Sequence, residues 1–447
     1  MDAILKIVQT VNVYLSDYIL IVLLIGIGLF YTVRTRFVQV RCFPEAMKRA
    51  FGGIKLRGGK QEGGLSSFQA LATAIAAQVG TGNIVGACGA IFWMWIIAFF
   101  GMATIYAEAV LAQETKQKNA DGSVDGGPVY YITKAFKGKG GKFLAGFFAV
   151  AITLALGFMG SMVQSNSIAE TSSKAFGIPT WAIGIVVALI AGFIFIGGAT
   201  RIASVAEKIV PVMALLYIGG GLVILACNIT KVPEAFGLIF KYAFAPQALI
   251  GGGAGAALKT AISQGAKRGL FSNEAGMGST PHAHALAKVE KPHDQGVVAM
   301  AGVFIDTFIV LTMTALVVIS TLYTKGGILE AGAAEGVSKA NMVQLAFGSV
   351  FGNKIGDIFV AICLAFFAFS TIIGWNLFGK INVVYLFGKK SEKIYAVIAV
   401  LFTFLGSCLS NDLVWELTDM FNQLMVIPNV LALAVLSGIV VKNVKKK

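Results

Sequence analysis

Two short segments of this sequence place glycine and polar residues inside long apolar runs. The first is Gly80-Thr81-Gly82-Asn83, which lies within 45 consecutive residues, 63–107, that contain no Asp, Glu, Lys or Arg. That run is more than twice the ~20 residues that a helix needs to cross a bilayer, so it predicts two membrane spans. Glycine weakens a helix, and we expect the first span to break at these residues. Irregular backbone at mid-membrane depth is tolerated only inside protein or beside water, and so the break predicts a binding site.

The chemistry expected at the first break follows from the two helix ends that it creates. A helix that restarts near Asn83 presents unpaired N–H groups and the positive end of its dipole to the gap. Residues 80–83, with Gln78 beside them, would therefore bind the carboxylate of a substrate. The carbonyl groups released at the other helix end, at Ala76 and Val79, suit a small hard cation such as Na⁺. The alternative is a simple packing kink, because glycine is common in membrane helices.

The second segment is Ser272-Asn273-Glu274-Ala275-Gly276, within a predicted span that otherwise holds mainly small residues. Its polar content is too dense for a surface that faces lipid, so we expect it to face the interior of the protein. Free carbonyls at residues 270–272 would receive the ammonium group of a substrate, and Phe271 would form a wall beside it. Glu274 would pair either with that ammonium group or with the adjacent Lys267-Arg268.

Two further carboxylates lie in apolar surroundings. Asp306 is isolated within the apolar run 297–320, where an unpaired charge is costly. It would either bind a cation or form an ion pair with Lys267 or Arg268. Glu108 follows the first uncharged run, and we expect it to be interfacial or hydrogen-bonded.

Composition assigns the chain to the polytopic membrane proteins. It has 447 residues, of which 57% are apolar and 13% charged, and its mean hydropathy is +0.79. A soluble domain carries about 25% charged residues. The five cysteines have no CxxC spacing, and neither a Walker sequence nor a nucleophile–base constellation occurs, so we expect no disulfide, metal framework or enzymatic activity. His282 and His284 would point to different faces of a helix, and we expect no metal site there.

Apolar windows and basic loops predict the topology. The net charge of +14 arises mostly from Lys and Arg in alternate loops, which would lie on one side of the membrane. By the positive-inside rule that side is the cytoplasm, which places the N-terminus outside and the C-terminus inside the cell. Membrane topology therefore explains the positive charge of these loops without nucleic acid as a partner. Contact with anionic lipid is a possible additional role. The eleven predicted spans are residues 17–32, 66–88, 89–113, 143–164, 181–199, 209–229, 248–285, 296–323, 355–378, 394–409 and 413–441.

Three motifs of the chain are specific enough to compare with known families. They are Ala-Gln-Val-Gly-Thr-Gly-Asn at residues 77–83, Gly-Gly-Pro-Val-Tyr-Tyr-Ile at 126–132, and Lys-Arg-Gly-Leu-Phe-Ser-Asn-Glu-Ala-Gly-Met-Gly-Ser at 267–279. Together they resemble the alanine or glycine:cation symporter family, and the resemblance covers nearly the whole chain. It implies an all-α polytopic membrane protein with about eleven transmembrane helices, namely one N-terminal helix and a five-plus-five inverted repeat with discontinuous second and seventh helices. The spacing of the two glycine-interrupted spans favours the same arrangement.

The resemblance implies secondary active transport in the cell membrane. The reaction would be Na⁺-coupled symport of a small neutral amino acid, alanine or glycine, by alternating access, and a monomer would suffice. Two alternatives remain open: a proton-coupled amino-acid transporter, and a gated channel, which would need a continuous pore lining. The expected units are an N-terminal helix with a basic cytoplasmic linker (1–65), two five-helix repeats (66–230 and 231–441) and a basic tail (442–447).

The implied fold also gives roles to residues outside the two breaks. In that fold the ninth span faces the second, so Ser370 and Thr371 would complete an oxygen site for Na⁺ begun by the span-two carbonyls. Their hydroxyls could equally bond back to the preceding helical turn. Trp375 would border the substrate unless it packs against lipid or a neighbouring helix, and with Phe271 it would leave room only for a hydrogen or a methyl group. Gln164, at the end of the fourth span, is a further pocket candidate.

Overall fold

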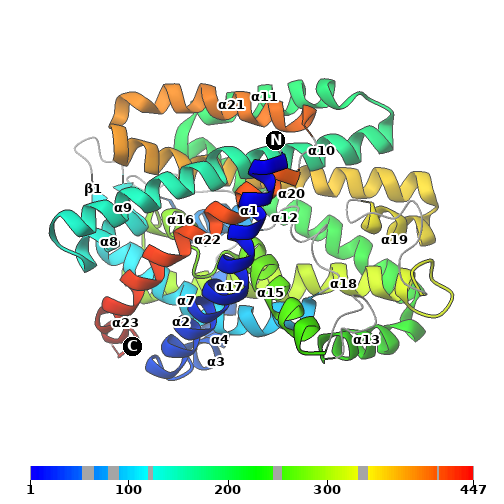
Figure 1. Cartoon of the computed structure of the whole chain (residues 1–447), viewed down its shortest axis with the longest axis horizontal. Coiled ribbons are helices and arrows are strands. Elements are labelled where there is room, and N and C mark those ends of the chain that lie inside the picture. The colour runs from blue at the N-terminus through cyan, green and yellow to red at the C-terminus, as the bar shows by residue number, and fades with distance from the viewer. Residues whose placement is uncertain are drawn as a thin grey trace.

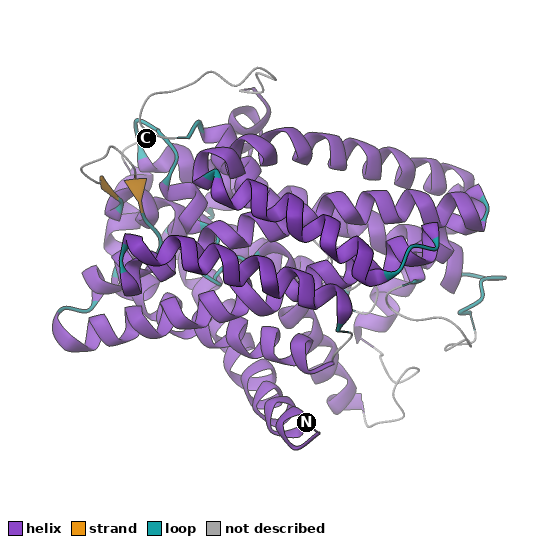
Figure 2. Cartoon of the chain, turned by 90° about the horizontal axis from the view of Figure 1, so that it is seen from above, coloured by secondary structure: helices purple, strands orange, loops and turns teal. Residues whose placement is uncertain are grey.

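The computed structural model is almost entirely helical (Figure 1). Its helices gather in one bundle, from which the N-terminal end of the chain projects (Figure 2). The only strands among the described residues are two short ones, which form an antiparallel hairpin. The structure describes residues 2–52, 65–78, 90–118, 124–244, 254–330, 341–409 and 412–445.

The first half of the chain begins with one continuous helical run and a short linker region. Its elements are α1 Asp2–Tyr14, η1 Leu15–Leu20, α2 Ile21–Arg34, α3 Val38–Arg41, α4 Phe43–Gly52, α5 Ser67–Gln78, α7 Ile91–Thr115, β1 Gln117–Lys118, β2 Val124–Asp125, α8 Pro128–Ala135, α9 Gly138–Ile152, η3 Thr153–Gly160, α10 Ser161–Phe176, α11 Thr180–Ile196 and α12 Gly198–Cys227.

The second half contains a helix interruption between α15 and α16. Its elements are η4 Ile229–Lys231, α13 Val232–Phe244, α15 Ala254–Asn273, α16 Pro281–Ala285, α17 Pro292–Val303, η5 Phe304–Leu311, α18 Thr312–Val318, η6 Ile319–Tyr323, α19 Met342–Phe351, α20 Asn353–Phe387, η7 Lys389–Ser391, α21 Glu392–Cys408, α22 Asp412–Val435 and α23 Ser437–Lys445.

Eight helical runs among the described residues are long and apolar enough to cross a membrane, and two shorter apolar helices accompany them. This confirms the expected all-α, multi-span membrane protein. The first run starts at Ala3, earlier than the predicted 17–32, because helical geometry continues through the π-helical turn η1. The eight are Ala3–Arg34, Ile91–Thr115, Gly138–Phe176, Gly198–Cys227, Pro292–Tyr323, Asn353–Phe387, Lys389–Cys408 and Asp412–Val435, and the shorter two are Thr180–Ile196 and Met342–Phe351.

The outer surface of α11 has the character of a lipid-facing surface. Trp181, Ile185, Leu189, Phe193 and Ile196 recur at spacings of three or four residues, which places them along one side of the helix. They are between 40% and 83% exposed. The other side of α11 packs against α21. An apolar row of this length is unfavourable in water and favourable in hydrocarbon, so this side of the bundle faces the bilayer.

Contacts between loops gather the predicted cytoplasmic segments at one end of the bundle. Leu65 of the linker bridges to Ala287, and the Lys116 ammonium donates to the Ala287 carbonyl at 2.9 Å. A surface pocket of about 350 Å³ is lined by linker residues together with Val441 and Val444 of the C-terminal helix.

Segments that sequence analysis assigns to the other side also contact one another. Lys174 lies 3.2 Å from Asp357, and the backbone N–H of Lys325 donates to Glu234 at 3.4 Å. Each of these contacts joins segments that the predicted topology places on the same side of the membrane.

Candidate functional site

The predicted interruption of the seventh span is present. Helix α15 ends at Asn273 and α16 begins at Pro281. Between them the chain turns at Glu274, with φ +57°, and at Gly276 and Gly278, with φ +89° and +84°. This left-handed conformation costs an L-residue energy, whereas glycine adopts it freely, so the two glycines permit the turn. The non-helical segment is buried, and its backbone must therefore find its partners within the protein.

The end of α5 meets this interruption. The side-chain amide of Gln78, the last described residue of α5, donates to the Asn273 carbonyl at 2.8 Å. Gln78 is buried, as expected for a residue beside a binding site. The other residues predicted at the first break, Val79, Gly80, Thr81, Gly82 and Asn83, lie outside the described residues.

The interruption exposes fewer carbonyls than the sequence suggests. The Leu270 carbonyl accepts the N–H of Glu274 at 3.0 Å, so the prediction of a free carbonyl at Leu270 is wrong. The last helical hydrogen bond of α15 survives because the chain leaves the helix only after Asn273. Within the predicted carbonyl set, Phe271 and Ser272 are the candidates that remain.

Glu274 faces inward rather than toward the basic pair of α15. The Trp375 indole N–H donates to Glu274 Oε1 at 2.6 Å, and the Ser279 hydroxyl donates to Oε2. Lys267 and Arg268 pair instead with Asp419 on α22, at 2.7 and 3.4 Å. The interpretation of Glu274 as their partner is wrong, because the left-handed turn directs its side chain away from the helix that carries them.

Asp306 lies on the π-helical segment η5, a geometry that is frequent at functional sites. It is fully buried and accepts hydrogen bonds from the hydroxyls of Ser272 at 2.8 Å and Thr307 at 2.9 Å. Asn273 donates to Thr307 at 3.2 Å. The structure therefore places Ser272, a predicted site residue of α15, beside Asp306. Lys267 and Arg268, the predicted ion-pair partners of Asp306, pair with Asp419 instead.

A second carboxylate holds the interruption from the opposite side. Glu108 of α7 accepts the Gly276 N–H at 3.1 Å and the Asn429 side-chain amide at 2.6 Å. Asn429 also donates to the Gly276 carbonyl at 2.9 Å and accepts from the Tyr131 hydroxyl. Glu108 is hydrogen-bonded, as expected, but it lies beside the helix interruption and not at the membrane–water interface. Sequence analysis missed Asn429, whose only signal was an amide inside an apolar segment.

Two hydroxyls of α20 meet a carbonyl of α5 where sequence analysis predicts an oxygen site. The hydroxyls of Ser370 and Thr371 lie 3.3 and 3.0 Å from the Ala76 carbonyl. They also bond back to the Phe367 carbonyl, at 2.8 and 3.0 Å, so both arrangements considered from the sequence coexist. The helices can approach closely because residue 374 is glycine, where an added Cβ would lie 3.1 Å from Ala77.

Two aromatic rings close the same region. Trp375 and Phe271 are both almost fully buried, and their ring centroids lie 5.7 Å apart at an interplanar angle of 86°. This edge-to-face arrangement is favourable for aromatic pairs. Behind Trp375, a Cβ added at Gly160 would lie 2.5 Å from the indole. Gln164 is buried one turn further along α10, which packs against α20.

The arrangement combines the interruption between α15 and α16, the end of α5, buried carboxylates, paired hydroxyls and two buried aromatic rings. Such a site can hold a zwitterion and a small cation through oxygen and N–H groups.

Comparison with known proteins identifies similar sequences along the whole chain. The sequence profile of a family described as "Sodium:alanine symporter family" matches residues 1–446. The "Sodium/alanine symporter AgcS" of Methanococcus maripaludis is 42% identical over 449 residues, which cover 98% of this chain and 96% of that protein. Two Bacillus subtilis proteins are similar as well. The "Putative sodium/proton-dependent alanine carrier protein YrbD" is 40% identical, over 96% of this chain and 90% of its own. The "Probable sodium/glutamine symporter GlnT" is 38% identical, over 98% and 90%.

Two solved structures share the fold at low sequence identity. MhsT in complex with L-phenylalanine superposes with a TM-score of 0.59 at 15% identity, over 87% of this chain and 99% of that chain. A Na⁺-coupled sialic acid symporter in a substrate-bound outward-open state superposes with a TM-score of 0.54 at 13% identity, over 89% and 82%. The helical arrangement is therefore shared with these two proteins.

Proposed function

We propose a transport mechanism for this chain from one premise: it belongs to the sodium:alanine symporter family. The chain is therefore a secondary active transporter and not an enzyme. Transporters of this architecture bind substrate and ion at interrupted helices near the middle of the membrane and expose that site to each side in turn. The interruption between Asn273 and Pro281 is the corresponding element here.

The substrate in this proposal is a small neutral amino acid, alanine or glycine. Alanine is named for two of the similar proteins and glutamine for a third, so the amino-acid backbone is what their substrates have in common. Its carboxylate would bind residues 80–83, where the sequence predicts that the helix restarts. Its ammonium group would face the Phe271 and Ser272 carbonyls and the nearby Glu274.

One observation carries the proposed ion site. Three oxygens from two helices converge where the Ser370 and Thr371 hydroxyls approach the Ala76 carbonyl, at 3.3 and 3.0 Å. Oxygen ligands of this kind suit a hard cation, and a helix end supplies the carbonyl. Asp306 is the charged candidate ligand in the same interior, and Val79 completes the proposed set.

Uptake into proteoliposomes tests the proposed function. Labelled alanine should accumulate when an inward Na⁺ gradient is imposed and should not accumulate when Na⁺ is equal on both sides. Accumulation driven by an H⁺ gradient alone would replace Na⁺ with a proton as the coupling ion. Equilibration without accumulation under either gradient would favour a channel-like pathway and contradict the proposal.

The double variant Ser370→Ala/Thr371→Ala should need roughly 5- to 150-fold more sodium for half-maximal uptake, because each buried hydroxyl contributes about 0.5–1.5 kcal/mol. The fold should persist, since α20 keeps its backbone hydrogen bonds. Thr403→Ala is the matched control, because its buried hydroxyl bonds only within α21, to Ala399 at 2.8 Å. If the wild type, Thr403→Ala and the double variant all need the same sodium concentration for half-maximal uptake, the proposed ion site is ruled out.

The proposed orientation places the N-terminus outside and the C-terminus in the cytoplasm. Support comes from the pocket that brings the linker beside α23 at one end of the bundle, while the run Ala3–Arg34 leads from the N-terminus to that end. In a background without native cysteines, Asp2→Cys should react with an impermeant thiol reagent in intact cells. Lys446→Cys should react only after the membrane is opened, and labelling of both from outside would contradict this orientation.

A further inference from the structure

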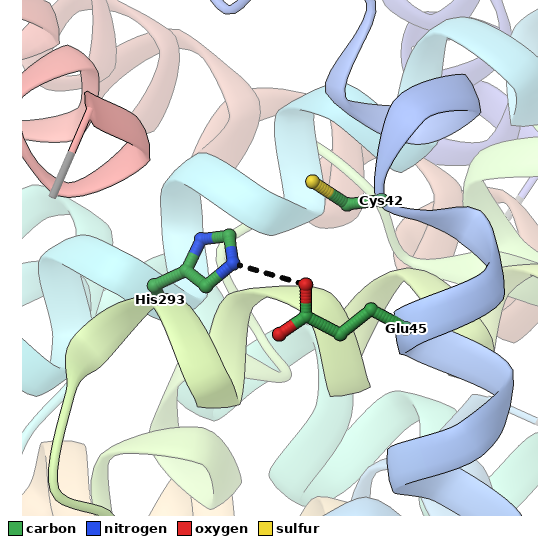
Figure 3. A group of neighbouring side chains, drawn as sticks. All are labelled: Cys42, Glu45 and His293. Atoms are coloured by element: carbon green, nitrogen blue, oxygen red, sulfur yellow. Dashed lines mark ion pairs between the residues drawn. The ribbon is translucent and has the colours of Figure 1, made fainter. Parts of the chain in front are cut away.

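Three side chains of metal-binding type meet at the junction of the linker helix α4 with α17 (Figure 3). They are Cys42, directly before α4, Glu45 in its first turn, and His293 in the first turn of α17. One ligand atom from each lies within 4.8 Å of the other two. None of the three belongs to the transport site described above.

The local fold positions this cluster firmly. Cys42 and Glu45 are three residues apart at a helix start, which places both on one face. Ala46 and Ala50 continue that face into the core and are almost fully buried, so α4 lies tightly on α17. Cys42 and His293 are 3% and 4% exposed, and the Glu45 side chain is 20% exposed. The cluster is thus enclosed by protein but reachable from solvent past Glu45.

Neighbouring groups orient two of the three ligand atoms. The Tyr106 hydroxyl lies 2.7 Å from His293 Nδ1, so Nε2 is the ring atom directed at Glu45, with its Oε2 at 3.6 Å. Arg49 binds the other Glu45 oxygen at 3.0 Å and Asp294 at 2.9 Å. Metal-binding histidines typically use their second nitrogen in this way, which fixes the ring and the tautomer.

We propose that Cys42, Glu45 and His293 form a Zn²⁺ site, with water as the fourth ligand. Sulfur, imidazole nitrogen and carboxylate oxygen are the three ligand types that zinc prefers. In a tetrahedral zinc site, bond lengths of about 2.0–2.3 Å place neighbouring ligand atoms about 3.3–3.6 Å apart. The 3.6 Å between His293 Nε2 and Glu45 Oε2 meets that spacing, and the Cys42 sulfur lies within 4.8 Å of both ligand atoms.

The ligand set distinguishes zinc from the hard cations. Mg²⁺ and Ca²⁺ take oxygen ligands almost exclusively, and this cluster offers only one carboxylate beside a sulfur and a nitrogen. Binding would convert the Cys42 thiol to a thiolate, which together with the Glu45 carboxylate balances the charge of the ion. The bound ion would clamp the linker helix α4 to the start of α17, at the end of the bundle where the basic loops gather.

Cobalt titration of the full chain in detergent tests the site, because Co²⁺ bound to a thiolate absorbs by charge transfer. In a variant with Cys88, Cys227, Cys363 and Cys408 changed to serine, one Co²⁺ per chain should produce this band, and Zn²⁺ should abolish it. Cys42→Ser in that background should remove the band. Glu45→Gln should weaken Co²⁺ binding at least about tenfold. Tyr106→Phe should weaken it to a similar extent, because the His293 ring loses its contact with the Tyr106 hydroxyl.

The controls separate a metal site from a simple packing cluster. Wild-type protein and the single variant Cys227→Ser should give the same band, because Cys227 is exposed and is not one of the three clustered residues. Glu45→Gln is the gentlest ligand change, since the side chain is partly exposed and keeps its size, so it decides the question even if Cys42→Ser does not fold. No charge-transfer band in the wild type, or an equal Co²⁺ affinity in Glu45→Gln, would overturn the proposal.

Discussion

Replacing Asp419 with alanine should lower the free energy of unfolding by about 3–5 kcal/mol, since it removes one side of a buried ion pair. Asp419 is 3% exposed and lies 2.7 Å from the Lys267 ammonium and 3.4 Å from Arg268. Without it, two cations remain at the α15–α22 contact, and Lys267 is itself only 10% exposed. Unfolding by denaturant in detergent micelles, followed by intrinsic fluorescence, measures the loss.

Asp357→Ala is the matched control for this change. Asp357 also pairs with a lysine, Lys174 at 3.2 Å, but there the lysine is 40% exposed and the aspartate 20%. Exposed pairs contribute only about 0–1 kcal/mol, so this variant should unfold almost as the wild type does. Equal losses in the two variants would show that burial of the Asp419 pair is not what stabilises the α15–α22 contact.

The same aspartate is connected to the proposed substrate wall. Arg268 lies over the Trp415 ring at 5.7 Å, and Trp415 packs on Phe271 with centroids 5.7 Å apart. If Asp419 is removed, Arg268 loses the charge that holds it in place. Alanine uptake by the folded fraction of Asp419→Ala should therefore fall as well, whereas uptake by Asp357→Ala should not.

Sequence reasoning located the second interruption because local composition carried the signal. The density of polar residues at 272–276 and the glycines around them belong to one short stretch, and the structure breaks the helix after Asn273. The paired hydroxyls at Ser370 and Thr371 were assigned through the implied fold, and they do reach α5. Both inferences needed only residues close in sequence or a known arrangement of spans.

Partner choice between distant carboxylates and cations could not be read from the chain. The sequence predicts ion pairs of Lys267 and Arg268 with Glu274 or Asp306. In the structure both cations pair instead with Asp419 of α22. Periodicity predicts that a helix has a buried face but not which neighbour that face meets. The zinc-type cluster shows the same limit, since Cys42 and His293 come together only through the packing of α4 on α17.

Trp375→Ala should allow the protein to transport leucine, which we expect the wild type to exclude. The indole is enclosed on two sides, by Phe271 at 5.7 Å in an edge-to-face contact and by the Cα of Gly160. Packed interiors relax little around an added branched side chain, so the ring sets an upper limit on substrate size. Removing it should also weaken alanine binding, because a cavity replaces favourable contacts. Competition of unlabelled leucine against labelled alanine uptake measures both effects.

Trp375→Phe separates the bulk of the ring from its hydrogen bond. Phenylalanine retains an aromatic wall but cannot donate to Glu274 Oε1, which receives the indole N–H at 2.6 Å. A hydrogen bond to a charged group contributes about 1.5–3 kcal/mol, so alanine affinity should fall roughly 10- to 150-fold if Glu274 positions the substrate ammonium. Leucine should still be excluded, because the wall remains.

Gly160→Ala tests the position of the Trp375 ring while residue 375 itself remains tryptophan. The added Cβ would lie 2.5 Å from the indole and 2.7 Å from the backbone carbonyl oxygen of Ala155, so both the ring and the local backbone must shift, and alanine uptake should fall. Gly219→Ala is the matched control, since a Cβ there meets nothing within 4 Å.

A Trp375→Ala protein that folds, transports alanine normally and still excludes leucine would contradict the role of the Trp375 ring in limiting substrate size. The indole would then serve only to pack α20 against α10, and selection for small substrates would have to come from other residues of the proposed site.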